Sequence, residues 1–422
     1  MAASGLASLA RRPSFAARLP GQMKGPAPAA LAVGATWPPP RPRLAVGEAR
    51  ALALRRRRWL GLLVVLVGFC LVAGLGAASW SPRWPTPDQM ARFLAGLPPP
   101  PGSVLDAYLA HPAWVQHAAL MDQAWQALEI RQLANVRAWA QATLGQAHTE
   151  AIPLFYLFSG PDYLYADTLF PGASLYVLCG LEPVGPLPET ETGWERDLGA
   201  WLNQVRGALS DYLVISFFRT KDLAGPLPLL YVMLARTGKT ILDVTPVQID
   251  PTGRLWAGRP VDPRGGFHEG VMITFCASHG RRQHLIYVST DLTDSKIQAY
   301  PGFLHFCDTL GRGNSLLKSA SYLLHRPHFS IARTFLLERS QTLVQDDSGI
   351  PVRWFTPDQW RLRVFGPYPG PIPMFARFYQ RDLAALVAGQ PLSCLDFSFG
   401  YRHRRGESTL ILATRHPLPS LR

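Results

Sequence analysis

The 422-residue sequence predicts an α/β domain with a mixed, partly parallel sheet and flanking helices, preceded by one membrane-spanning helix and a helical segment. Residues 152–158 (IPLFYLF) and 173–179 (ASLYVLC) are short, almost wholly apolar runs, typical of strands covered on both faces. Residues 163–170 between them can form one short helix. The three segments together predict a strand–helix–strand unit with parallel strands.

An uncharged apolar run from Trp59 to Trp80 predicts the membrane helix, and four arginines at positions 55–58 directly precede it. Its central part, residues 60–78, is long enough to cross a hydrocarbon layer of ~30 Å as a helix. Flanking arginines stay in the cytoplasm, so the C-terminal domain is expected to be exported, either periplasmic or extracellular. Cleavage of this segment as a signal peptide, which would release a secreted protein, is the alternative. The predicted anchor residues include Leu60, Leu63, Val67 and Leu71.

The positive charge of the chain is concentrated before this run. The whole sequence has 42 Lys and Arg against 29 Asp and Glu, a net charge of +13. The first 58 residues hold eleven of these bases and one acid, Glu48, which leaves 31 bases against 28 acids for the rest. Binding of nucleic acid needs basic residues clustered on a folded face, so no nucleic-acid partner is predicted.

Composition divides the chain into five segments. Apolar residues recur three or four positions apart between Trp114 and Trp139, which indicates helix, and proline runs favour extended backbone. The predicted segments are a disordered basic tail rich in Pro and Ala (1–54), the anchor or signal sequence (55–79), a Pro-rich neck (80–103), a helical segment (104–150) and the α/β domain (151–416).

The strand–helix–strand unit resembles the opening of Rossmann-like proteins, including methyltransferases. In those families a glycine-containing turn follows the first strand and an acidic residue ends the second, and Gly160 and Glu182 stand at these places. This sequence has only one glycine in the turn, and Pro161 lacks the backbone N–H that a phosphate cradle uses. An exported domain would also meet little nucleotide or S-adenosylmethionine. The resemblance therefore implies a fold, and no cofactor is predicted.

The remaining α/β domain shows further helical and strand patterns, and its last segments alternate and turn like an antiparallel hairpin. Helices are expected over 194–218, 303–310, 316–324 and 329–339, strands over 241–249, 271–275, 284–289 and 342–345, and the hairpin over 395–401 and 408–414.

Polar side chains that follow predicted strands are the candidate site residues, because ligands of α/β sheets bind beyond the carboxyl ends of parallel strands. Carboxylates gathered there can serve as acid and base or bind a hard cation. The alternative is structural, since Ser and Asp also cap helices and form turns. The predicted catalytic residues are Ser159, Asp162 and Glu182; Asp243, Asp346 and Asp347 are predicted to bind ligand, and Asp291 has an equivalent position.

Searches for established motifs exclude several functions. Thr237-Gly238-Lys239-Thr240 has the end of a phosphate-binding loop, but Met233 stands where the first glycine belongs. The sequence contains no G-x-S-x-G, H-E-x-x-H or C-x-x-C. The usual serine hydrolase arrangement is therefore unsupported, and no metal site is predicted.

Two hypotheses of different classes follow, and the sequence does not decide whether the protein is an enzyme. The first is a membrane-tethered, extracytoplasmic module that binds a ligand, or an envelope polymer or protein partner. The second is a hydrolase that uses the carboxylates near Ser159, Asp162 and Glu182. A Rossmann-like transferase is a further alternative if the domain is cytoplasmic.

Overall fold

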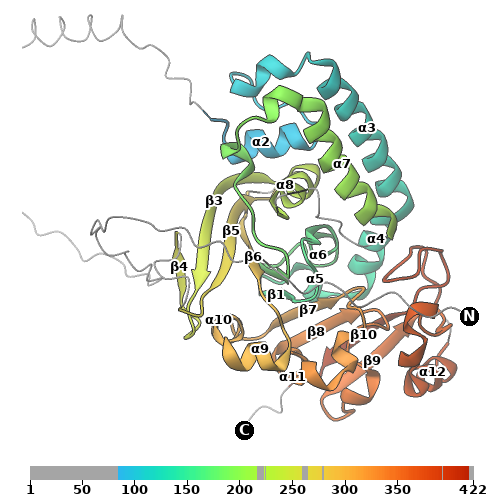
Figure 1. Cartoon of the computed structure of the whole chain (residues 1–422). Helices are drawn as coiled ribbons and strands as arrows, with labels where there is room; N and C mark the ends of the chain where they lie inside the picture. Colours follow the sequence, from blue (N-terminus) through green and yellow to red (C-terminus); the bar gives the residue numbers. More distant parts are fainter. Residues whose placement is uncertain are drawn as a thin grey trace, which may run out of the picture. The chain divides into compact units, whose positions relative to one another are not determined.

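A ten-stranded sheet organises the part of the chain that the computed structural model describes, residues 84–215, 223, 225–258, 265–277, 280–391 and 393–417 (Figure 1). The predicted tail and the predicted anchor around Leu60, Leu63, Val67 and Leu71 lie outside these residues. Within them, no helix has the length and apolar character needed to cross a membrane. The strands are β1 (Leu154–Tyr156), β2 (Leu175–Gly180), β3 (Thr240–Ile249), β4 (Leu255–Ala257), β5 (His268–Cys276), β6 (Arg282–Ser289), β7 (Gly313–Leu317), β8 (Ser340–Gln345), β9 (Trp360–Phe365) and β10 (Leu410–Arg415).

The strand order is β4-β3-β5-β6-β2-β1-β7-β8-β10-β9. The five central strands, from β6 to β8, are mutually parallel, and β1 pairs with β2 in the register Leu154↔Tyr176. Numbered along the chain, these parallel strands have the order 3-2-1-4-5 of doubly wound α/β proteins, in which the order reverses between β1 and β7. Antiparallel strands extend both edges. The predicted mixed, partly parallel sheet with flanking helices is confirmed.

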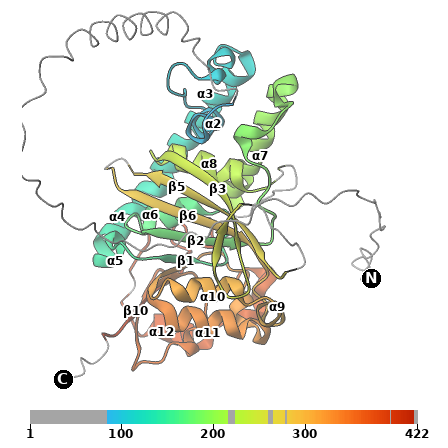
Figure 2. The same cartoon turned by 90° about the vertical axis from the view of Figure 1, so that its left-hand side faces the viewer.

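The innermost strands β1 and β2 are almost wholly apolar because helices cover both faces of the sheet (Figure 2). In β1, Leu154 and Tyr156 belong to one hydrophobic cluster, whereas Phe155 belongs to the other. This alternation follows from the two-residue period of a strand. The first cluster contains residues of α2 (Pro87–Leu94), α4 (Ala134–Thr143), α6 (Tyr163–Leu169) and α8 (Leu227–Arg236), and the second contains residues of α9 (Asp294–Ala299), α10 (Gly302–Thr309) and α11 (Ser330–Arg339).

The predicted helical segment forms a long rod of α3 (Pro112–Leu128) and α4, followed by the short α5 (Gln146–Thr149). A π-helical turn, Glu129–Leu133, joins α3 to α4. This turn directs Gln132 inward, where its amide nitrogen donates to the Tyr165 hydroxyl at 2.7 Å and its amide oxygen accepts from the Ser398 N–H at 3.1 Å. α3 packs on α7 (Leu198–Ile215), whereas α4 packs on α6.

Most of the further predicted elements are present. α10, α11, β3, β5, β6 and β8 lie where helices and strands were expected, and β5 and β6 pair antiparallel. α7 covers most of the expected helix 194–218, whose last three residues are outside the described part.

Three expectations are wrong. Residues 313–317, partly inside an expected helix, form strand β7, because its polar residues Asn314 and Ser315 are buried and hydrogen-bonded, which hides the strand pattern. Residues 395–401 form no strand, and β10 pairs with β8 and β9 in place of the expected hairpin partner. The expected extended neck contains helix α2, which starts with Pro87 and is capped by Thr86 and Gln89.

Candidate functional site

A cavity of about 290 Å³, here called the strand-end crevice, opens beyond the carboxyl ends of β1, β2, β6 and β7. It lies where the strand order reverses, the position at which open α/β sheets bind their ligands. Its lining consists of four strand-end segments, a phenylalanine at the start of α11 and one distant tyrosine: residues 157–160, 179–182, 290–292, 319–321 with Leu323, Phe329 and Tyr401.

The crevice combines apolar walls with carboxylates and hydroxyl groups. Phe158, Leu292 and Phe329 contribute apolar surface, and Glu182 and Asp291 contribute carboxylates. None of the described lining residues is Lys, Arg or His. The crevice is therefore suited to an uncharged or cationic ligand with apolar parts and hydrogen-bond donors, and it opposes an anion.

Glu182 is held beside the end of β2 by Tyr287 of β6. The Tyr287 hydroxyl donates to the Glu182 carbonyl oxygen at 3.1 Å and lies 3.4 Å from its Oε2. Burial and the nearby carboxylate raise the pKa of Tyr287 above its ordinary value, so it remains a donor at neutral pH. A Cβ atom at Gly180 would lie 2.7 Å from Glu182 Oε2, so glycine at this position gives the carboxylate its space.

The turn after β1 forms the adjacent wall. Gly160 has a φ of +55° and donates its N–H to the Cys179 carbonyl at 3.0 Å, which joins this turn to β2. The Ser159 hydroxyl donates to the Gly160 carbonyl at 2.7 Å. Ser159 and Glu182, two of the predicted catalytic residues, therefore line the same crevice.

Asp162, the third predicted catalytic residue, lies behind the crevice and does not line it. Its carboxylate caps α6 by accepting from the Tyr165 N–H at 3.2 Å. Its Oδ2 is 3.0 Å from the Lys318 ammonium and accepts from the Tyr156 hydroxyl at 2.8 Å, and both charged side chains are 3% exposed. Asp162 therefore links α6 to the end of β7, and the three-residue arrangement that the hydrolase hypothesis requires is not assembled.

The segment after β7 has unusual backbone geometry. Ser319, Ser321 and Tyr322 have φ angles of 54°, 53° and 53°, in the left-handed region that costs an L-residue roughly 1–2 kcal/mol. Side chains from outside the loop hold it: the Ser319 N–H donates to Asp346 Oδ2 at 3.3 Å, and the Ser321 N–H donates to the Tyr401 hydroxyl at 3.1 Å. Ser319 Oγ is buried and has no hydrogen-bond partner among the described residues. Strained backbone clusters at functional sites, and a buried polar atom without a partner is rare enough to require an explanation.

Asp346 and Asp347, predicted to bind ligand, support this loop from behind and do not line the crevice. Asp346 also accepts from the Ser348 hydroxyl at 2.6 Å, and Asp347 accepts from the Tyr322 hydroxyl at 2.5 Å. Burial, followed by the neighbouring Asp347, raises the pKa of Asp346 to about 7.

The two remaining acidic candidates have different positions. Asp291 lines the crevice, and its Oδ1 accepts from the Thr293 N–H at 2.9 Å. Asp243 is exposed on β3, where its Oδ2 accepts from the Thr245 hydroxyl at 2.5 Å. β3 belongs to the antiparallel edge of the sheet, so Asp243 is remote from the ends of the parallel strands.

Sequence reasoning missed Thr290, Ser319, Ser321 and Tyr401 of the lining. Thr290 stands next to the predicted Asp291 and follows from the same strand-end rule. Ser319 and Ser321 follow strand β7, part of which was expected to be a helix. Tyr401 follows no predicted parallel strand, so its neighbours in the sequence do not identify it as a lining residue.

No known protein family, no curated protein and no solved structure matches this chain. Within the part of the chain that the structure describes, no group of three or more His, Cys, Asp or Glu side chains is arranged to hold a metal ion. The chemistry of the crevice is therefore the basis for assigning a function.

Proposed function

We propose that the strand-end crevice binds a nucleoside that carries no phosphate group. One observation carries the proposal: Gly160 and Glu182 line the same crevice at the ends of β1 and β2. Glu182 follows Gly160 by 22 positions. In Rossmann-like proteins an acidic residue about 20 positions after the glycine turn hydrogen-bonds a ribose hydroxyl. Glu182 is accordingly the proposed ribose acceptor.

The turn after β1 is unsuited to binding a phosphate group, and for this reason the proposed ligand has none. Pro161 offers no N–H, and the N-terminus of α6 is capped by the Asp162 carboxylate. α6 has only seven residues. Glu182 and Asp291 would also repel a diphosphate, and no basic side chain among the described lining residues would balance them.

A cationic nucleoside matches this set of groups best, and we assign the ligand to the S-adenosylmethionine class. Bound here, such a ligand would supply an electrophilic methyl group, which makes a Rossmann-like transferase the corresponding activity. The chain itself would contribute Glu182 for the ribose hydroxyls, apolar walls for the base, and Asp291 to favour positive charge.

Calorimetric titration of the full chain in detergent tests the proposal, with S-adenosylmethionine, adenosine, NAD⁺ and ATP as ligands. We expect the first two to bind and both phosphate-bearing ligands to bind at least about tenfold more weakly. Glu182→Gln should weaken adenosine binding about tenfold or more, because it replaces a charge-assisted hydrogen bond by a neutral one. Asp243→Asn, an exposed acid on β3, is the matched control and should change nothing. Absence of adenosine binding, or equal binding by the Glu182 variant, would refute the proposal.

We also propose, from the sequence, that residues 60–78 anchor the chain in a membrane. The arginines at positions 55–58 support an exported domain, and this supports a second function, an extracytoplasmic module that binds an envelope polymer or protein partner. A C-terminal reporter enzyme that is active only outside the cytoplasm distinguishes the two functions. Activity of the reporter would refute the methyl-donor function, because an exported domain has no supply of that ligand. If this reporter is inactive, and a reporter that works only in the cytoplasm is active when fused at the same position, the exported module is refuted.

A further inference from the structure

A second cavity, of about 330 Å³, is lined by the opposite end of α6 and shares no lining residue with the strand-end crevice. Its walls come from the α3–α4 rod, from α5 and from the turn that follows α8. They are mostly polar, and the residues that define the chemistry of this polar cavity are Trp125, Arg137, Gln141, His148, Asp167 and Lys239.

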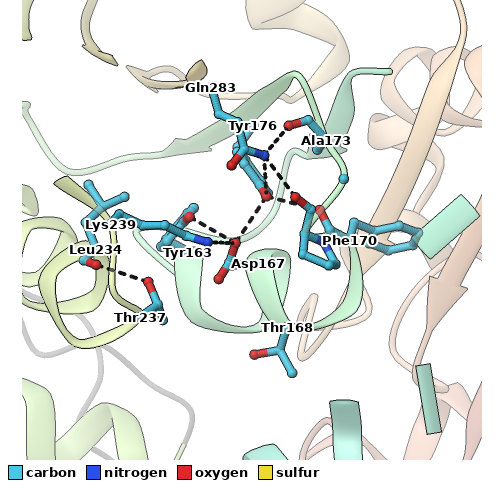
Figure 3. Close-up of polar contacts among 12 residues, drawn as sticks. Tyr163, Asp167, Thr168, Phe170, Ala173, Tyr176, Leu234, Thr237, Lys239 and Gln283 are labelled. Carbon is cyan, nitrogen blue, oxygen red and sulfur yellow. Dashed lines mark hydrogen bonds and ion pairs between the residues drawn. The ribbon is translucent and has the colours of Figure 1, made fainter. Parts of the chain in front are cut away.

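Asp167 lines the polar cavity and stands at the centre of a network of polar contacts (Figure 3). Its Oδ1 is 2.9 Å from the Lys239 ammonium and lies 3.1 and 3.3 Å from the hydroxyls of Tyr163 and Tyr176. Figure 3 shows the second carboxylate oxygen pointing away from these three groups. No described residue donates to Oδ2, although the side chain is only 10% exposed. A carboxylate oxygen without a donor has an unused capacity to accept hydrogen bonds from a ligand.

The surroundings keep Asp167 in this orientation. Burial, followed by the Asp167 charge, raises the pKa of Tyr163 and of Tyr176 well above the ordinary value, so both hydroxyls stay protonated. Gln283 Nε2 lies 3.4 Å from the Tyr176 hydroxyl and donates to the Ala173 carbonyl at 2.6 Å. The carboxylate therefore has a fixed position, which is what a preformed binding site requires.

Each Lys, Arg, Asp and Glu side chain that lines the polar cavity has an ion-pair partner, either in the lining or, for Arg236, just outside it. Arg137 binds Glu129 through two contacts of 2.7 and 3.3 Å, and Lys239 is paired with Asp167. Arg236, which also lines the cavity, is paired with Asp122. A charged ligand would be repelled by the member of each ion pair that carries the same sign of charge. The lining therefore favours an uncharged ligand.

The polar cavity offers a ligand both hydrogen-bond acceptors and hydrogen-bond donors. His148 Nδ1 donates to the Leu169 carbonyl at 2.8 Å, which leaves Nε2 as an acceptor. Asp167 Oδ2 is a second acceptor. The Lys239 ammonium has three N–H groups, of which its ion pair with Asp167 uses one, and the Gln141 amide is exposed at the wall.

We propose that the polar cavity binds an uncharged sugar of monosaccharide size. A hydroxyl group both donates and accepts, so neighbouring sugar hydroxyls can satisfy Asp167 and Lys239 together. The Trp125 ring provides an apolar surface for the C–H face of a pyranose. The volume stands at the lower end of the range of about 300–1,000 Å³ typical of ligand sites.

The test is calorimetric titration of the full chain in detergent with glucose, galactose, N-acetylglucosamine and inorganic phosphate. At least one sugar should bind saturably, and phosphate should not bind. Gln141→Trp should weaken sugar binding about tenfold or more, because an indole at the wall occupies the ligand space. Gln126→Trp is the matched control, since Gln126 is also exposed on the same rod but lies outside the lining, and it should bind sugar normally.

Asp167→Asn provides a second test and should also abolish binding while circular dichroism shows the variant to be folded. If it fails to fold, the Gln141 and Gln126 pair decides alone. Failure of every sugar to bind would overturn the proposal, as would equal binding by the Gln141 and Gln126 variants. Loss of sugar binding in Glu182→Gln with retention in Gln141→Trp would place the sugar in the strand-end crevice, which also overturns it.

Discussion

The buried ion pair between Asp162 and Lys318 joins the two strands between which the sheet reverses. Asp162→Ala should lower the free energy of unfolding by about 3–5 kcal/mol, because it leaves the buried ammonium without the carboxylate 3.0 Å away. Asp308→Ala removes an ion pair with Arg339 that is 36–47% exposed and should cost less than about 1 kcal/mol. Urea unfolding measures both values. Equal, small losses would contradict the structural role of Asp162.

Asp346 should make stability depend on pH in an unusual direction. Its pKa is about 7 in the folded protein against the ordinary 3.8, so the folded state holds an extra proton between these values. Its contribution is complete below pH 3.8 and is lost as the pH rises through 7. The free energy of unfolding of the natural protein, minus that of Asp346→Asn, should therefore fall between pH 4 and 7, by at most about 1.4 kcal/mol per pH unit.

Groups that do not interact with Asp346 cancel in that difference, whereas the neighbouring Asp347, whose pKa burial also raises, contributes to it together with Asp346. Burial lowers the pKa of His117 and of His325 to about 4, so their contributions are lost as the pH falls from 6.5, the opposite direction. Both histidines remain in the Asp346 variant. A difference curve from urea unfolding that is flat or rises with pH would show that Asp346 is ionised in the folded protein.

At the residue scale, the sequence predicted part of the crevice. Ser159, Glu182 and Asp291 lie in one cavity because the strand-end rule depends only on the location of parallel strands. Asp162, Asp346 and Asp347 satisfy the same rule but support other residues. The direction of a side chain after a strand depends on tertiary partners, which the sequence does not show.

The loop after β7 carries backbone strain that glycine would relieve. Ser319→Gly should raise the free energy of unfolding by about 1 kcal/mol, because it removes both a left-handed serine and a buried unpartnered hydroxyl. Ala320→Gly, at a residue without positive φ in the same loop, should instead cost about 0.5–1 kcal/mol. Destabilisation by Ser319→Gly in urea unfolding would refute this account of the loop.

At the element scale, prediction succeeded where apolar patterning was continuous and failed where buried polar groups interrupted it. β1 and β2 are apolar on both faces and were predicted, with their helix α6. In β7, the Asn314 amide donates to the Ala147 carbonyl, and Ser315 contacts Ser340 Oγ at 2.6 Å. These partners lie far along the chain, so the two polar residues could not be recognised as buried.

The helices before β1 share one hydrophobic cluster with the sheet. Phe93 of α2 is fully buried and stacks on Trp114 of α3, with ring centroids 5.7 Å apart. Asp88 of α2 also accepts from the Ile241 N–H of β3 at 2.9 Å. Phe93→Ala should therefore lower the free energy of unfolding of the whole described fold by about 3–5 kcal/mol.

One cooperative transition is expected for this variant, with tryptophan fluorescence and far-ultraviolet circular dichroism changing together in urea. Leu181→Ala, which truncates a side chain that is 74% exposed, is the control and should leave the midpoint unchanged. Two separate transitions would show that the helices fold independently of the sheet.

The π-helical turn between α3 and α4 allows the two halves of one helical rod to pack on two different helices. An extra residue within a helix shifts every later side chain by about 100° around the axis, given roughly 3.6 residues per turn. α3 packs on α7 before this turn, and α4 packs on α6 after it. Deleting a single residue from the turn would restore regular winding and rotate Val136 and Ala140 away from the core they occupy. The number of residues in this turn is therefore as important for the packing of α4 as the identity of its side chains. Related chains should vary the side chains of the turn more readily than its length.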